Sequence, residues 1–228
     1  MSVRLGSLGR SRVGGLPIWV IVIGGLLIGA LVVIGSNAAG EAGVADRSGA
    51  LALRSATVSV RSTGCGAEVT GSGVRLGDGS VLSTRRMVQG SRVQVGGDDV
   101  AGVAVGESLD VSVITPSGDR SDRGTVAVAS SLPTVGGSVL VAGQRDGEVT
   151  VRRSQIVGAV AGRTAAEPLW SWRLDVALGP DDVGGGVTDE RGGLVGIVTG
   201  SDVVGGVALV TPVSAALGES LVAAFACP

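Results

Sequence analysis

The side chains that could do chemistry in this sequence are mainly carboxylates. The chain contains no histidine, so it offers no imidazole as a general base or as a metal ligand. It contains no lysine, which excludes a Schiff base, a Ser-Lys dyad and the lysine of a phosphate-binding P-loop. Two cysteines are too few for a four-thiolate zinc site, and the acidic residues lack the spacing of a calcium loop. We therefore expect no metal site and no cofactor.

Three segments nevertheless have the spacing of a catalytic site. Residues 70–88 read TGSGVRLGDGSVLSTRRMV, residues 107–114 read ESLDVSVI, and residues 175–195 read DVALGPDDVGGGVTDERGGLV. In this order they resemble the histidine, aspartate and serine motifs of the trypsin-like (chymotrypsin-fold) serine proteases. The resemblance is to the HtrA-like and the actinobacterial membrane-anchored branch in particular, and it extends over residues 56–228.

The resemblance assigns a position to each residue of the catalytic triad. Arg86 aligns with the histidine, Asp110 with the aspartate and Val183 with the serine, while Asp181 aligns with a glycine of the oxyanion hole. Valine offers no nucleophile, and the pKa of arginine, above about 12, is too high for a general base. Asp181 brings negative charge to a place that should bind an anion. From these departures we predict that the chain is a catalytically degenerate homologue and not an enzyme.

The remaining residues of these segments have structural interpretations. We expect Asp110 to pair with Arg86, with Arg85 as the competing partner and solvated charges as the alternative. The glycines at positions 184 and 185 indicate a tight turn. Asp181 and Asp182 are interpreted as solvated acids of a loop rather than as metal ligands.

The two cysteines, Cys65 and Cys227, form an even pair in a domain that we expect outside the cytoplasm. This pattern favours a disulfide between them, with two free thiols as the alternative. A catalytic role for Cys65 is disfavoured, because no histidine or lysine is present to lower the pKa of its thiol.

Short valine-rich runs, separated by Gly, Asp and Ser, must position these residues. Such runs from Ala56 onward predict an all-β domain. The resemblance specifies it as two six-stranded β-barrels of chymotrypsin type. The last segment, VSAALGESLVAAF at 213–225, has a helical period and follows a proline, so we expect a C-terminal helix there.

The N-terminal region predicts one transmembrane helix. Residues 17–35 read PIWVIVIGGLLIGALVVIG, within a stretch of 28 residues that carries no charge, and arginines precede it. About 20 apolar residues span a bilayer, and basic residues stay on its cytoplasmic side. We therefore expect residues 1–16 in the cytoplasm, 17–35 in the cell membrane, 36–55 as a linker and 56–228 as an extracytoplasmic domain. A cleaved signal peptide is the alternative.

The sequence leaves three classes of function open. The leading interpretation is a membrane-anchored, extracytoplasmic pseudoprotease that binds an envelope protein or peptide through its former active-site cleft, with Arg86 and Val183 as binding residues. The alternatives are a structural or remnant envelope domain without a ligand, and an enzyme with residual or unrecognised hydrolase activity. The net charge of −2 gives no electrostatic reason for binding nucleic acid.

Overall fold

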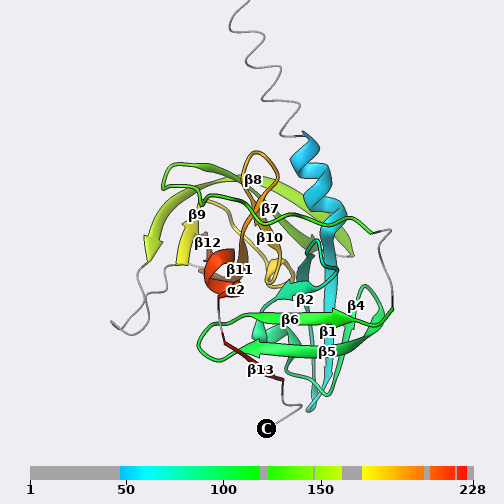
Figure 1. Ribbon diagram of the computed structural model, residues 1–228. Helices are drawn as coiled ribbons and strands as arrows, with labels where there is room; N and C mark the ends of the chain where they lie inside the picture. The colour runs from blue at the N-terminus through cyan, green and yellow to red at the C-terminus, as the bar shows by residue number, and fades with distance from the viewer. Residues whose placement is uncertain are drawn as a thin grey trace, which may run out of the picture. The chain divides into compact units, whose positions relative to one another are not determined.

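The computed structural model describes residues 47–118, 123–145, 147–160, 171–202, 206–218 and 220–224. The predicted transmembrane helix at 17–35 lies outside this part of the chain. Within it, no helix has the length and hydropathy of a membrane span. The described strands form two antiparallel sheets, each closed on itself (Figure 1).

The first sheet is a six-stranded barrel to which a seventh strand is added. Its strand order is β13-β5-β4-β1-β2-β3-β6, and pairing between β5 and β6 closes the ring. The elements are β1 (Thr57–Gly64), β2 (Ala67–Arg75), β3 (Val81–Ser83), the 3-10 helix η1 (Arg85–Val88), β4 (Arg92–Val95), β5 (Asp98–Gly106), β6 (Ser112–Pro116) and β13 (Leu221–Ala223).

The second sheet is a closed six-stranded barrel in the order β10-β11-β12-β9-β8-β7. The elements are β7 (Ser138–Arg145), β8 (Glu148–Val160), β9 (Ser171–Leu174), the 3-10 helix η2 (Pro180–Asp182), β10 (Gly186–Thr188), β11 (Leu194–Asp202), β12 (Val207–Pro212) and the helix α2 (Val213–Leu217). The prediction of two six-stranded barrels is therefore confirmed.

A shared apolar core joins the two barrels. One cluster of buried side chains includes Val74 and Leu82 from the first barrel together with Leu140, Leu194 and Ile197 from the second. Each barrel also has an apolar cluster made largely of valines. The alternating valines of the sequence supply these clusters, because every second side chain of a strand points into its barrel.

The predicted C-terminal helix over 213–225 is wrong in its length. The helix α2 ends at Leu217, before Gly218, a residue that disfavours helix interiors. Leu221–Ala223 instead form β13, which pairs with β5 in the register Leu221↔Gly106. A short apolar run fits a helix or a strand by its pattern alone, and here the available edge of β5 decides.

The predicted linker over 36–55 also needs correction, because residues 47–56 are helical. Leu53 and Ala56 lie three positions apart, on one helix face, and both are fully buried. The Arg54 guanidinium donates to the carbonyl of Val149 on β8 through Nε, at 3.1 Å, and Nη2, at 3.0 Å. This helix is therefore part of the folded domain and is attached to the second barrel.

Candidate functional site

The sequence-predicted pair of Arg86 and Asp110 is present. Arg86 lies on η1, where the neighbouring Met87 and Val88 point into the core of the first barrel and leave Arg86 half exposed. Its Nε and Nη2 atoms lie 2.9 and 2.8 Å from Asp110 Oδ2. The backbone N–H of Arg86 donates to Oδ1 of the same carboxylate at 3.3 Å, so Asp110 also holds the 3-10 turn itself.

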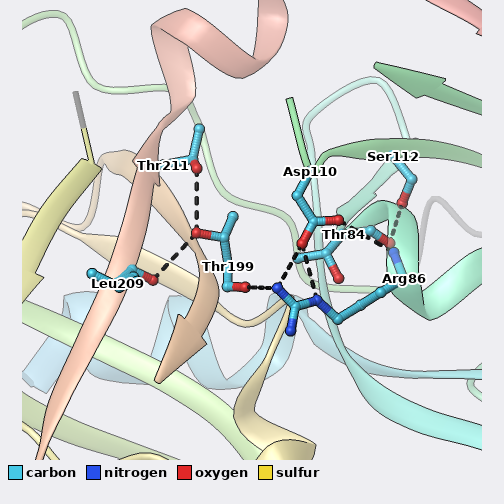
Figure 2. A network of polar contacts seen from close by, with 7 residues as sticks. All are labelled: Thr84, Arg86, Asp110, Ser112, Thr199, Leu209 and Thr211. Atoms are coloured by element: carbon cyan, nitrogen blue, oxygen red, sulfur yellow. Dashed lines mark hydrogen bonds and ion pairs between the residues drawn. The ribbon is translucent and has the colours of Figure 1, made fainter. Parts of the chain in front are cut away.

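Arg86 also contacts the second barrel. Its Nη2 donates to the carbonyl oxygen of Thr199 on β11 at 2.5 Å, and Figure 2 shows the guanidinium between Asp110 and Thr199. The Thr199 hydroxyl is directed to Leu209 and Thr211 on β12. Arg86 therefore links a carboxylate of the first barrel to a backbone acceptor of the second. No pattern in the sequence pointed to Thr199.

The edge of β11 beside this contact lacks a strand neighbour in the described part of the chain. β10 pairs with Leu194–Ile197. Gly184 and Gly185, which precede β10, make two further hydrogen bonds to the backbone of Val198. Among the residues that the structure describes, Gly200–Asp202 of β11 pair with β12 alone. An unpaired edge presents backbone donors and acceptors to any strand that approaches it.

Val183 lies in a different setting from the Arg86–Asp110 pair. Its side chain is only 5% exposed and belongs to the apolar core of the first barrel. Its N–H donates to the carbonyl of Pro180 at 3.2 Å within η2, and its carbonyl accepts the N–H of Ser72 at 2.8 Å. The N–H at this position is therefore used inside the loop.

The following glycine confirms the predicted tight turn. Gly184 has a φ of +89°, and a Cβ atom there would come within 2.0 Å of the Ser72 carbonyl oxygen. Only glycine combines this backbone conformation with so close an approach. β2 and the loop therefore meet backbone to backbone.

The two acids of the loop differ from each other. Asp181 is half-buried, and its carbonyl accepts the hydroxyl of Ser72. Asp182, which we predicted to be a solvated acid, is fully buried, so that prediction is wrong. Its Oδ2 accepts Arg152 Nη2 and the N–H of Gly179, each at 2.7 Å. An ion pair makes burial of the carboxylate possible, and its partner on β8 could not be read from the sequence.

No cysteine within the described residues is a free thiol. Cys65 lies at the turn between β1 and β2, with a φ of 55°. Cys227 lies outside the described residues, so its pairing with Cys65 stays a prediction.

Comparison with solved structures identifies the fold. The Rv3671c protease of M. tuberculosis, in its active form, superimposes with a TM-score of 0.65 at 20% identity, over 75% of this chain and 82% of that chain. A serine endoprotease from Yersinia pestis gives 0.62 at 19% identity, over 75% and 63% of the two chains. The HtrA-type protease AlgW with a tripeptide gives 0.61 at 20% identity, over 75% and 61%.

These likenesses show that the chain has the fold of the HtrA-type, trypsin-like serine proteases, as the motifs predicted. The sequence matches no family model and no curated protein.

The comparison corrects the prediction that the chain is not an enzyme. We drew it from the residue types at positions 86, 181 and 183. The structures that share the fold are serine proteases, and one of them is described as the active form. Because these compared structures are serine proteases, the prediction drawn from those residue types is wrong.

Proposed function

We propose that this protein binds peptides as an added strand along the free edge of β11, at the junction of the two barrels. The observation that carries the proposal is that residues 200–202, beside the Thr199 carbonyl, pair with β12 and with no other strand of the described chain. Main-chain hydrogen bonds to such an edge give affinity for extended peptides of many sequences. The HtrA-type protease AlgW has itself been solved with a tripeptide.

Arg86 and Val183 are the proposed binding residues, in the positions where the resemblance places a catalytic histidine and serine. The Arg86 side chain is half exposed, and its Nη1 atom donates to no group within the described residues. A carboxylate of the peptide, most simply its C-terminus, would accept a charge-assisted hydrogen bond from this atom. Val183 would add a small apolar contact, since little of it is exposed.

Hydrogen exchange of the purified full-length chain tests the location. The probe is a pool of hexapeptides of degenerate sequence. We expect the pool to slow amide exchange in residues 199–202, while the amides of β13 serve as the control and do not change. Mass spectrometry of the recovered pool reports whether the peptides stay intact. Absence of protection at 199–202 would refute strand addition there, and processed peptides would replace binding by hydrolysis as the function.

A second measurement tests the role of Arg86. We compare pools with a free C-terminal carboxylate and with a C-terminal amide. The wild-type chain should prefer the carboxylate, and Arg86→Met should abolish the preference. Arg85→Met is the matched control, because Arg85 donates to the carbonyl of Gly106 rather than to Asp110. An unchanged preference in Arg86→Met would remove Arg86 from the site.

We further propose that residues 17–35 anchor the protein in the cell membrane with the β-domain outside the cytoplasm, where its partners would be peptides or proteins of the envelope. The uncharged 28-residue stretch and the arginines before it support this orientation. Anchoring raises the local concentration of the domain toward other envelope proteins. Protease added to intact protoplasts should digest the β-domain, and its protection would contradict the orientation.

A disulfide between Cys65 and Cys227 is part of the same proposal. These are the two cysteines of the chain, and an oxidising compartment favours their pairing. The exported protein should react with no alkylating reagent before reduction, and Cys65→Ser should expose one thiol. Two reactive thiols in the native wild-type protein would refute the bridge.

A further inference from the structure

We infer that Arg86 gates the peptide site: in the present structure its guanidinium covers the backbone acceptor at which strand addition to β11 would begin. This inference concerns the regulation of the site and rests on the proposed function. The gate adds to the proposed function the prediction that the side chain which attracts a peptide carboxylate also covers the edge of β11 when no peptide is bound.

The covered acceptor is produced by an irregularity in β11. The register with β12 shifts between Val198↔Val210 and Gly200↔Leu209, so Thr199 is an extra residue with no opposite partner. Such a bulge redirects the backbone groups of the extra residue away from the ladder. The freed Thr199 carbonyl accepts Arg86 Nη2 at 2.5 Å, a short, charge-assisted contact.

The guanidinium also lies over the next residue of the edge. A Cβ atom built on Gly200 would lie 3.9 Å from the same Nη2 atom. The Arg86 side chain thus occupies space along the edge as well as the acceptor. An approaching strand that takes the place of Nη2 on the Thr199 oxygen therefore has to displace the guanidinium first.

Asp110, in the first barrel, holds the Arg86 side chain in place against β11 of the second barrel. Its Oδ2 accepts both Nε and Nη2 of Arg86, and its Oδ1 accepts the Arg86 backbone N–H. Three of the four contacts that fix this arginine therefore come from the first barrel, and one crosses to the second (Figure 2). Opening the gate requires Nη2 to leave the Thr199 carbonyl and Asp110, while the bonds from Nε and from the backbone N–H to Asp110 can persist.

Removing the gate should strengthen the binding of peptides that have no carboxylate to offer. The experiment measures the affinity of the full-length chain for the amidated hexapeptide pool by fluorescence anisotropy. Arg86→Met keeps the length of the side chain but cannot donate to Thr199, and we expect its affinity to rise about tenfold, the equivalent of one charge-assisted hydrogen bond. Arg85→Met is the matched control and should bind as the wild-type chain does.

A second variant keeps the test informative if Arg86→Met folds poorly. Asp110→Asn leaves Arg86 in place but removes the charge that holds it, so we expect a smaller rise in affinity. Circular dichroism verifies that each variant is folded.

The possible outcomes separate the gate from the proposed function. Equal or weaker binding of the amidated pool by Arg86→Met and Asp110→Asn, with binding by the wild-type chain, would overturn the gate and leave the peptide site standing. Binding of the amidated pool by Arg86→Met with none by the wild-type chain would support the gate, and protection of residues 199–202 of the wild-type chain by peptides with a free carboxylate would still decide the proposed function. No binding by any of the chains would overturn the proposed function together with its gate.

Discussion

The hydroxyl of Ser72 donates to the carbonyl of Asp181 at 2.6 Å, although 109 positions separate the two residues. The same hydroxyl accepts the N–H of Gln144 on β7 at 2.9 Å. The backbone N–H of Ser72 donates to Val183, at 2.8 Å. One fully buried serine of the first barrel therefore fixes the loop of η2 and a strand of the second barrel at once.

Ser72→Ala should destabilise the protein by about 2 kcal/mol, because it leaves two half-buried backbone groups, the Gln144 N–H and the Asp181 carbonyl, without the hydroxyl that they share. Ser83→Ala is the matched control. Ser83 is equally buried, but within the described chain its hydroxyl makes a single hydrogen bond, to the Ser72 carbonyl at 2.7 Å, and its loss should cost about 1 kcal/mol. Urea unfolding measures both. Equal losses would contradict the larger role of Ser72.

Gly184→Ala should destabilise the chain by about 3 kcal/mol or more, since it combines an unfavourable φ with an overlap against the backbone of β2. Gly147→Ala isolates the first of these effects. Gly147 has a φ of +82° and open space at its Cβ position, so only the strain of about 1 kcal/mol is expected. Thermal unfolding of the two variants gives the difference, and similar midpoints would show that the close approach is relieved without cost.

Arg152→Ala should cost about 3 kcal/mol, because it removes the guanidinium that lies 2.7 Å from the buried carboxylate of Asp182. Arg153→Ala changes the next residue of β8. The Arg153–Glu190 pair is long, at 3.8 Å, and both side chains are more than half exposed, so its loss should cost less than about 1 kcal/mol. Unfolding in urea measures the loss of stability in Arg152→Ala and in Arg153→Ala. A small loss for Arg152→Ala would mean that backbone donors alone sustain the buried charge.

The stability that the turn between β2 and β3 contributes to the fold should depend on pH. The hydroxyl of Ser80, at 2.6 Å, and its N–H, at 2.9 Å, hold the pKa of Asp78 below its ordinary value. A carboxyl whose pKa is lower in the folded than in the unfolded state contributes stability above its unfolded pKa of about 3.9. That contribution is lost as the pH falls through the folded pKa.

Ser80→Ala should therefore raise the pKa of Asp78 toward its ordinary value and reduce the acid-dependent part of stability that this residue contributes. Carbon-13 NMR titration of the carboxyl groups measures the shift. Asp99 is the internal control, because Arg92 lowers its pKa and the substitution does not touch that pair. An unchanged pKa of Asp78 would assign its shift to the remaining backbone donors.

The fold and one contact of the site could be predicted because they depend on local patterns. Valine runs and turn glycines predict strands, and the three motifs predict their arrangement. The pair of Arg86 and Asp110 follows from placing two charged residues at neighbouring positions of the resembling fold, and the structure confirms it.

The contacts that the sequence did not reveal depend on register and on partners far along the chain. Thr199 lies in an ordinary strand segment, and its carbonyl is available to Arg86 because of a bulge that only the pairing with β12 defines. Asp182 is buried because Arg152, 30 positions earlier, reaches it from β8. The strand Leu221–Ala223 exists because β5 offers it an edge. No local pattern carries this information.

The placement of β13 bears on how the chain folds during synthesis. Residues 57–116 supply all strands of the first sheet except β13. The strand β13, Leu221–Ala223, is translated only after the whole second barrel. Pairings of such high sequence separation form slowly, and an unpaired edge of a half-made sheet favours aggregation. The six-stranded ring of the first sheet can close before the second barrel is made, but its added strand β13 can pair with β5 only after the second barrel has been translated.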